Sequence, residues 1–458
     1  MQSLRDREKL IAWDKDYLWH PFTQMRDWLT DEPIIIERGE GVYLIDIDGN
    51  RYLDGIASMW TNVHGHNHPE LNAALKAQLD RIAHSTLLGY SNIPAIQLAQ
   101  KLVEITPSGL NKVFYSDNGS TAVEVALKMA YQYWQHKGQP QRNLFVHFDK
   151  AYHGDTVGAM SVGGIESFHS TFSSLLFKSI RVSVPETYTP PKSVDTPKNL
   201  SAELVKTHWL NAVERVLSEH SKQIAGIILE PLIQGAGGML ISPKGFLKEL
   251  AALAKKCETL LIVDEVMTGL GRTGKMWACE HENVTPDLLC TAKGLAAGYL
   301  PLAATLTTDE IYNAFLGEYR DLKTFFHGHT FTGNPLACAV ALENIAIFER
   351  ENLLDRLQIT VKHFNKRLQE FYVLPHVGDV RVCGMAAGVE LMKYPETNTP
   401  YPFEEKVGIR VCKAALAQGA ILRPLVNTIV LMPPLQISIS ELDSLLDITY
   451  RAISEATG

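Results

Sequence analysis

The sequence predicts an α/β protein built on a mainly parallel β-sheet, and two features of the chain support this prediction. Between about residues 111 and 308, short apolar runs rich in β-branched residues alternate with longer segments whose apolar residues recur every three or four positions. Runs of the first kind are typical of buried strands, and segments of the second kind are typical of helices that bury one face. Alternation of the two favours a parallel sheet covered by helices on both faces.

Four runs are the clearest strand candidates, and each ends in polar residues. In chain order they are NKVFYSD (111–117), NLFVHFD (143–149), IAGIILEP (224–231) and TLLIVDEV (259–266). Ligands of such sheets bind beyond the carboxyl ends of the strands. The polar residues that follow these runs are therefore the first candidates for function.

Two segments between these runs have the spacing of amphipathic helices. They are STAVEVALKMAYQYWQHK (120–137) and GFLKELAALAKKCE (245–258). We therefore expect one helix directly after the first strand and another directly before the strand at 259–266.

The two flanks of this region differ from it. Residues 34–55 alternate in polarity and contain the turn sequence Asp48-Gly49-Asn50, which predicts a small antiparallel hairpin or meander. After Asn334-Pro335, residues 337–371 form one long helical pattern that leads into another mixed α/β stretch. We expect both flanks to build a second, smaller domain.

These patterns predict a large central domain at residues 66–334 and a smaller α/β domain from residues 1–65 and 335–458. The most linker-like stretch is PETYTPPKSVDTP (185–197), rich in proline and threonine. Because it lies between segments of the central pattern, we interpret it as a surface insertion within that domain.

The composition excludes several classes of protein. With 43 Lys and Arg against 51 Asp and Glu, the 458-residue chain has a formal charge of −8 and lacks a basic block, which argues against a nucleic-acid or anionic-membrane surface. No run of 18 apolar residues predicts a membrane span, and the charged N-terminus lacks a signal-peptide core. The six cysteines form no C-x-x-C pair. We therefore expect a cytoplasmic protein with reduced thiols.

The first strand candidate ends just before Asn118, Gly119 and Ser120, where a helix is expected to begin. Glycine allows close backbone approach, and serine can cap the helix and donate its hydroxyl group. The free N–H groups and the helix dipole then form a cradle for an anion. A plain strand–loop–helix cap explains this segment equally well.

Two charged residues follow other apolar runs. Asp264 ends a run hydrophobic enough for a central strand, where a carboxylate is poorly solvated and requires a cationic partner. Lys293 follows DLLCTA (287–292) and precedes the small-residue stretch GLAAGYLP (294–301). Taken alone, Asp264 is more simply interpreted as an acid that caps the next turn, and Lys293 as an exposed loop lysine.

Two further patterns suggest other ligands. Gly269 to Gly274 match the dinucleotide pattern G-x-G-x-x-G, but no clear amphipathic helix follows, and Met276 replaces the Ser or Thr of a P-loop. A nicotinamide-dependent oxidoreductase that uses this loop is the alternative from another class. The histidines of 64–68 and 327–329 lack acidic or cysteine partners at ligand-like spacing, so we predict no metal site.

The motifs taken together resemble those of the class III aminotransferases, and the resemblance covers nearly the whole chain. The matching segments, in order, are Asn118-Gly119-Ser120, Tyr152-His153-Gly154, Asp264-Glu265-Val266, Lys293-Gly294 and Thr330-Phe331-Thr332-Gly333-Asn334-Pro335. The resemblance implies a fold type I transferase that depends on pyridoxal 5′-phosphate (PLP), with a mainly parallel seven-stranded sheet in its large, PLP-binding domain. It also implies a homodimer with its sites at the subunit interface.

The resemblance implies catalytic roles for three residues. Lys293 resembles the lysine that binds PLP covalently and later moves a proton as a free base. Asp264 is similar to the carboxylate that keeps the pyridine nitrogen protonated. Tyr152 resembles the aromatic residue stacked on the pyridine ring, and Val266 is expected on the other face.

Other residues are implied to hold the cofactor phosphate. Gly119 and Ser120 match the cradle inferred above. His329 and Thr330 resemble the segment that reaches the phosphate from the neighbouring subunit.

Further segments resemble the branch of this class that aminates 8-amino-7-oxononanoate in biotin synthesis. They include Trp19-His20-Pro21-Phe22-Thr23-Gln24-Met25, Ser58-Met59-Trp60, Gln132-Tyr133-Trp134 and Leu422-Arg423-Pro424. The residues that this resemblance places against substrate are Phe22, Met59, Trp60, Tyr152, Lys293, Gly328 and Arg423. Arg423 resembles the arginine that clamps the substrate carboxylate through two parallel hydrogen bonds.

The chain departs from the familiar members of this branch in its substrate pocket. Those that use S-adenosylmethionine often have tyrosine at the position of Phe22 and a tryptophan pair at the position of Met59-Trp60. Some close relatives use lysine as the amino donor. Both donors therefore remain open, as does another class III ω-aminotransferase activity.

Overall fold

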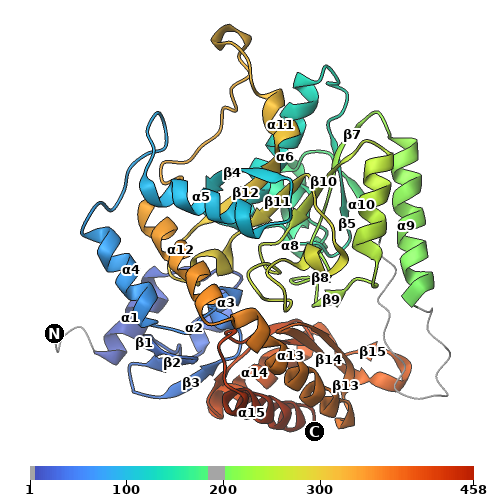
Figure 1. The fold of residues 1–458 in the computed structure, drawn as a ribbon. Helices are drawn as coiled ribbons and strands as arrows, with labels where there is room; N and C mark the ends of the chain where they lie inside the picture. The colour runs from blue at the N-terminus through green and yellow to red at the C-terminus, as the bar shows by residue number, and fades with distance from the viewer. Residues whose placement is uncertain (1–5, 184–201) are drawn as a thin grey trace.

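The computed structural model describes residues 6–183 and 202–458 (Figure 1). The predicted surface insertion at 185–197 lies outside the described residues. Among the described helices, none is long and apolar enough to cross a membrane. All six cysteines are free; three are buried and three are partly buried.

A seven-stranded sheet forms the centre of the molecule, in the order β4-β12-β11-β10-β7-β5-β6. Its strands are β4 (Leu110–Ser116), β12 (Ala303–Thr308), β11 (Leu288–Thr291), β10 (Leu260–Asp264), β7 (Ile224–Leu229), β5 (Leu144–Phe148) and β6 (Ile180–Val182). Only β12 runs antiparallel to its neighbours, β11 and β4. The predicted mainly parallel, seven-stranded sheet and α/β fold class are confirmed.

Helices cover both faces of this sheet, as Figure 1 shows. Along β10, Leu261 and Val263 pack into one apolar cluster, while Leu260 and Ile262 pack into another on the opposite face. The first cluster includes residues of α5 (Ile93–Ile105), α9 (Ala202–Glu219) and α10 (Phe246–Lys256), and the second includes α6 (Gly119–His136). Burial on both faces explains why the central strands read as continuous apolar runs.

Both chain ends meet in a smaller four-stranded sheet. The predicted antiparallel meander is present as β1 (Ile36–Glu40), β2 (Tyr43–Asp46) and β3 (Arg51–Asp54). The fourth strand, β16 (Ala420–Ile421), pairs in parallel with β3. Both flanks thus contribute strands to this sheet, whereas the division into a large and a small domain, with boundaries at 65/66 and 334/335, stays a prediction.

The C-terminal region contains a second small sheet and the helices that cover it. Its strands are β13 (Val377–Cys383), β14 (Ala386–Tyr394), β18 (Thr428–Leu431), β17 (Arg423–Leu425) and β15 (Thr399–Pro400). Helices α14 (Val407–Ala417) and α15 (Ile439–Thr457) pack on each other here, and α13 (Leu353–Gln369) packs on α15 and β13. Outside this region lie α3 (Ala57–Trp60), α4 (Pro69–Leu79), α7 (Val157–Ser161) and α11 (Asp309–Ala314).

The predicted long helix at 337–371 is wrong in one respect, because the structure divides it into two. Helix α12 (Pro335–Arg350) ends before Asn352, and α13 (Leu353–Gln369) begins after it. Asn352 has φ +48°, a left-handed conformation that no residue adopts inside an α-helix but that asparagine tolerates better than most. The apolar spacing continues across the break, so the periodicity alone concealed it.

Replacement of Asn352 tests this break. We expect Asn352→Ala to destabilise the protein by about 1 kcal/mol, because alanine has a Cβ and no polar group to favour φ > 0. Asn352→Gly should leave stability nearly unchanged. Thermal unfolding of both variants beside the parent chain measures the difference, and equal melting temperatures for alanine and glycine would contradict the assignment.

Candidate active site

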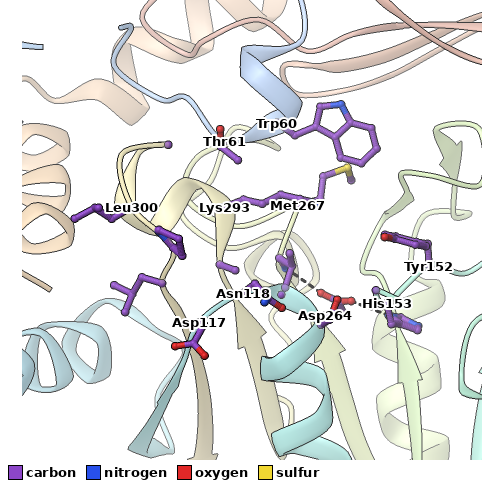
Figure 2. A pocket seen from close by; sticks show the side chains of 18 of the residues that line it. Trp60, Thr61, Asp117, Asn118, Tyr152, His153, Asp264, Met267, Lys293 and Leu300 are labelled. Carbon is purple, nitrogen blue, oxygen red and sulfur yellow. Dashed lines mark hydrogen bonds and ion pairs between the residues drawn. The ribbon is translucent and has the colours of Figure 1, made fainter. Parts of the chain in front are cut away.

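A cavity of about 450 Å³ opens at the carboxyl ends of the parallel strands (Figure 2). The segments that follow β4, β5, β7, β10 and β11 line it, together with Trp60 of α3 and the loop that precedes β12. This is the sheet edge at which ligands of parallel α/β folds bind. The predicted polar strand ends are therefore brought to one place.

A buried acid–histidine pair lies at the floor of this cavity. Oδ2 of Asp264, the last residue of β10, lies 2.7 Å from Nδ1 of His153, and the Val266 N–H donates to Oδ1 at 3.0 Å. Asp264 is only 4% exposed and His153 only 3%. Nε2 of His153 has no hydrogen-bond partner in the described part of the chain. His153 thus supplies the polar partner that a carboxylate at a buried strand end requires.

Lys293 follows β11 and points into the cavity. Figure 2 shows its side chain between Trp60 and Asp264, and its Nζ lies 4.8 Å from the centre of the Trp60 ring. Burial lowers the pKa of this lysine, while the carboxylates of Asp264 and Glu230 act in the opposite direction. The residue has φ +44° and starts a 3₁₀ turn, so its backbone is held in an unusual conformation at the strand end. A desolvated amine of this kind is suited to act as a nucleophile or a base.

The N-terminus of α6 lies where the sequence predicts an anion cradle. Asn118 caps the helix through the N–H of Thr121, which leaves the earlier N–H groups of Gly119 and Ser120 without acceptors within the helix. A Cβ at Gly119 would lie 2.6 Å from Cγ1 of Val266, so only glycine fits there. The 18-residue helix α6 adds its dipole. This end of the cavity can therefore hold an anion such as a phosphate group.

Tyr152 and Val266 line the cavity from different strand ends. The Tyr152 hydroxyl donates to Oδ2 of Asp155 at 2.7 Å, and its ring contacts Phe168 edge-on at 6.1 Å. Burial raises the pKa of this hydroxyl well above its ordinary value, so it stays protonated. A flat group placed between the Tyr152 and Val266 positions would thus have an aromatic and an aliphatic neighbour.

The predicted substrate residues lie at different distances from this cavity. Trp60 lines it, but Phe22, Met59 and Arg423 do not. The Phe22 ring lies 5.2 Å from that of Phe168, which in turn contacts Tyr152, so Phe22 is two aromatic contacts from the cavity wall. Met59 is 40% exposed. Burial lowers the pKa of Arg423.

The segment Gly328-His329-Thr330 is not brought to the cavity by this chain. It lines a second hollow of about 1050 Å³ together with residues 84–99 and β4. Nδ1 of His329 lies 2.6 Å from Oδ2 of Asp117, a residue that also lines the first cavity. A Cβ at Gly328 would meet open space. Among the described residues of this chain, His329 thus connects the segment to the first cavity through its contact with Asp117.

Two residues of the cavity were missed as candidates from the sequence. His153 belongs to the matched segment Tyr152-His153-Gly154 but received no role, and Glu230, the last residue but one of the run at 224–231, has no motif of its own. Because ligands bind beyond strand ends, Glu230 was one of several polar candidates, but nothing in the sequence assigned it a specific role. Their importance depends on strands β5 and β7 being neighbours, which periodicity does not show.

The loop at 269–274 does not have the structure that its glycine pattern suggested. The Arg272 side chain is buried and donates to the carbonyl oxygens of Met385 (3.2 Å) and Pro433 (2.7 Å). The next helical segment is a five-residue 3₁₀ turn at Ala278–Glu282, so the helix that a dinucleotide motif requires is absent from this described stretch.

The histidines that suggested a metal mostly have protein partners. His64 bonds to Asn344, His66 to Asp54 and His329 to Asp117. Ligand atoms of His68, Glu70 and Glu351 do come within 4.8 Å of one another. Both of these carboxylates already pair with arginines, Glu70 with Arg350 and Glu351 with Arg356.

The donor set fits one kind of cofactor. An amine for covalent binding, a buried carboxylate for a cationic ring nitrogen and a helix N-terminus for a phosphate surround one cavity. A phosphorylated pyridine aldehyde has all three complementary groups. The residues present thus fit PLP.

Comparison with known proteins agrees with this chemistry. The family model of the class III aminotransferases matches residues 25–453. A protein of Geobacter sulfurreducens named adenosylmethionine-8-amino-7-oxononanoate aminotransferase is 52% identical over 453 residues, which cover 99% of each chain.

Solved structures agree as well. The crystal structure of adenosylmethionine-8-amino-7-oxononanoate aminotransferase from Methanocaldococcus jannaschii has a TM-score of 0.92 at 47% identity and covers 98% of this chain and 99% of that one. The ω-transaminase of Pseudomonas jessenii in complex with PMP has the same TM-score at 30% identity and covers 98% of both chains.

These similarities extend over the full fold and include the strand ends that form the cavity. Class III aminotransferases are PLP-dependent fold type I enzymes, which agrees with the fit between the cavity and that cofactor. The chain therefore belongs to the class III aminotransferase family and is an aminotransferase.

Proposed function

We propose that this enzyme uses PLP to transfer an amino group to 8-amino-7-oxononanoate, giving 7,8-diaminononanoate in biotin synthesis. One observation carries the cofactor part of the proposal: Lys293, Asp264 and the N-terminus of α6 line the same cavity. The names of the full-length relatives at about 50% identity support the acceptor.

Lys293, Asp264 and His153 each have a role in this proposal. When bound, PLP supplies a ring that accepts the electrons of the carbon–hydrogen bond that is broken. Lys293 binds the cofactor. Once released as a free amine, its Nζ accepts the proton and passes it on, a task favoured by the lowered pKa of this group. Asp264 pairs with the ring nitrogen, and His153 holds the carboxylate in place through its 2.7 Å contact.

The walls of the cavity orient the cofactor and substrates. Gly119 and Ser120 bind the phosphate with their N–H groups, and Tyr152 and Val266 enclose the two ring faces. Trp60 provides an aromatic wall for the aliphatic chain of the acceptor.

The remaining substrate residues enclose the entrance in this proposal. Phe22 reaches the Tyr152 wall through Phe168, and Met59 lies beside Trp60. Arg423 clamps the substrate carboxylate.

We infer a homodimer in which the partner subunit's Gly328, the partner's His329 and the partner's Thr330 complete the site. The hollow of about 1050 Å³ supports this, because unusually exposed apolar residues lie on the segments that form it. Leu88 is 88% exposed, Tyr90 is 73% and Phe326 is 73%. Large exposed apolar side chains around a hollow are typical of a surface that another protein chain covers.

The acceptor is tested by a two-step assay with purified enzyme. We expect 8-amino-7-oxononanoate to restore the absorption of the PLP form after an amino donor has converted it, whereas pyruvate should do so far more slowly. Turnover of pyruvate without turnover of 8-amino-7-oxononanoate would favour a general ω-transaminase, the activity of the Pseudomonas jessenii neighbour. The same assay, begun with S-adenosylmethionine or with lysine, decides between the two proposed donors.

The covalent role of Lys293 is tested by Lys293→Ala. The variant should lose the near-visible absorption of the bound cofactor and lower the rate of transamination by about 10²–10⁴-fold, because the amine that moves the proton is gone. Lys248→Ala is the matched control, since Lys248 is an exposed lysine of α10. Borohydride reduction followed by peptide mapping should label Lys293 in the parent chain; a label at another lysine would refute the assignment.

Substitution of Arg423 tests carboxylate recognition. Arg423→Lys should raise KM for the acceptor by about 10–100-fold with a smaller change in kcat, because a lysine cannot form the paired hydrogen bonds of a guanidinium group. Arg410→Lys, on the exposed face of α14, is the control. An unchanged KM at Arg423→Lys would assign carboxylate binding to another group.

A further inference from the structure

Glu230 is a buried carboxyl group whose surroundings differ from those of every other acid at the site. It directly follows β7 and is 6% exposed. Its Oε1 accepts the Tyr152 N–H at 3.0 Å, and its Oε2 accepts the Gly235 N–H at 2.8 Å. No lysine, arginine or histidine nitrogen of the described chain lies within ion-pair distance. Glu230 is therefore fixed in place by neutral donors and has no cationic counterpart in direct contact.

Several ionisable groups face this carboxyl group across the cavity. His153 follows β5, Asp264 ends β10 and Lys293 follows β11, and all three line the same cavity as Glu230. Tyr152, whose N–H it binds, is held protonated. The positive charge of Arg272, which does not line the cavity, also lowers the pKa of Lys293. The cavity thus contains two buried carboxyl groups and one amine, which makes the charge on Glu230 matter to Lys293.

We propose that Glu230 is a positioning residue that controls the proton on Lys293: when ionised it keeps the lysine as an ammonium group, and when protonated it favours the free amine. This rests on the proposed role of Lys293 in the transamination. The proton exchanges with solvent or substrate, and no bond of the cofactor is made or broken by Glu230. The carboxyl group acts on the reaction through Lys293, without contact with the reacting atoms.

The surroundings of Glu230 allow its carboxyl group to be either protonated or ionised near neutral pH. Burial raises the pKa of Glu230 to about 7; the charge of Asp264 acts in the same direction, while His153 and the two backbone donors oppose it. Burial lowers the pKa of Lys293, and the charges of Asp264 and Glu230 raise it. Removing the charge of Glu230 must therefore lower the pKa of Lys293 further.

A purely structural role for Glu230 is the alternative. Its two backbone bonds join the Tyr152 segment to the Gly235 turn, so it also fastens two walls of the cavity together. A clamp of this kind would affect stability and cofactor affinity. It would leave the pH at which Lys293 titrates unchanged, and this difference separates the two roles.

The test is the pH dependence of Lys293 in Glu230→Gln. In the cofactor-free enzyme, the rate at which an amine-directed acylating reagent labels Lys293 is followed by peptide mass mapping from pH 5 to 10. In the holoenzyme, the cofactor absorption is titrated over the same range. We expect both midpoints to move down by about one pH unit in Glu230→Gln, because a nearby anion that favours the ammonium form is lost.

Two further variants keep the test decisive. Glu230→Asp retains the charge and should return the midpoints towards those of the parent chain, even if the shorter side chain weakens the clamp. Glu265→Gln removes another fully buried carboxyl group, one that is bonded to Thr268, Ala278 and Cys279 and does not line the cavity. It should leave the midpoints in place.

Unchanged midpoints in Glu230→Gln, or an equal shift in Glu265→Gln, would overturn the proposal. Failure of the proposed function is a separate outcome: the parent chain would then show no cofactor absorption and no labelled adduct at Lys293. If Glu230→Gln does not fold, the midpoints are measured in Glu230→Ala, which also removes the charge: a fall of about one pH unit supports the proposal, and unchanged midpoints overturn it.

Discussion

The contact between Asp264 and His153 depends on the order of the strands more than any other in the site. Asp264 ends β10 and His153 follows β5, and these strands are separated in the sheet by β7 alone. Only a parallel arrangement brings all three carboxyl ends to the same edge, where a carboxylate can remain charged because a polar partner meets it. The cavity, the anion cradle and the lysine are arranged around this pair.

Desolvation is what gives the cavity its chemical character. The same burial that stabilises the sheet lowers the pKa of Lys293 and raises that of Glu230 to about 7, so the Glu230 carboxyl group becomes able to exchange its proton near neutrality. Packing also sets the residue at position 119, because Val266 lies so close that any side chain larger than that of glycine would displace Val266. The residues at these strand ends therefore determine both the packing and the electrostatics of the cavity.

The sequence predicted much of this arrangement because the relevant signals are local. The runs that became β4, β5, β7 and β10 have the composition of buried strands, and Gly119 and Ser120 lie where a helix starts after a strand. The break at Asn352 was missed, since apolar spacing continues through it and a single left-handed residue leaves little trace in the pattern. Glu230 was missed as a functional residue because its importance depends on which strands are neighbours.

The sequence by itself determined the class of fold, the polar strand ends and the motif set that identifies the family, since each depends on residues close together in the chain. Tertiary structure alone decided the pairing of His153 with Asp264, the clamp of Glu230 between Tyr152 and Gly235, and the place of Gly328, His329 and Thr330 outside this chain's cavity. The contact of His153 with Asp264 joins residues 111 positions apart, and that of Glu230 with Tyr152 joins residues 78 positions apart. Their energies come from burial and charge, and both are properties of the assembled sheet edge rather than of any segment within it.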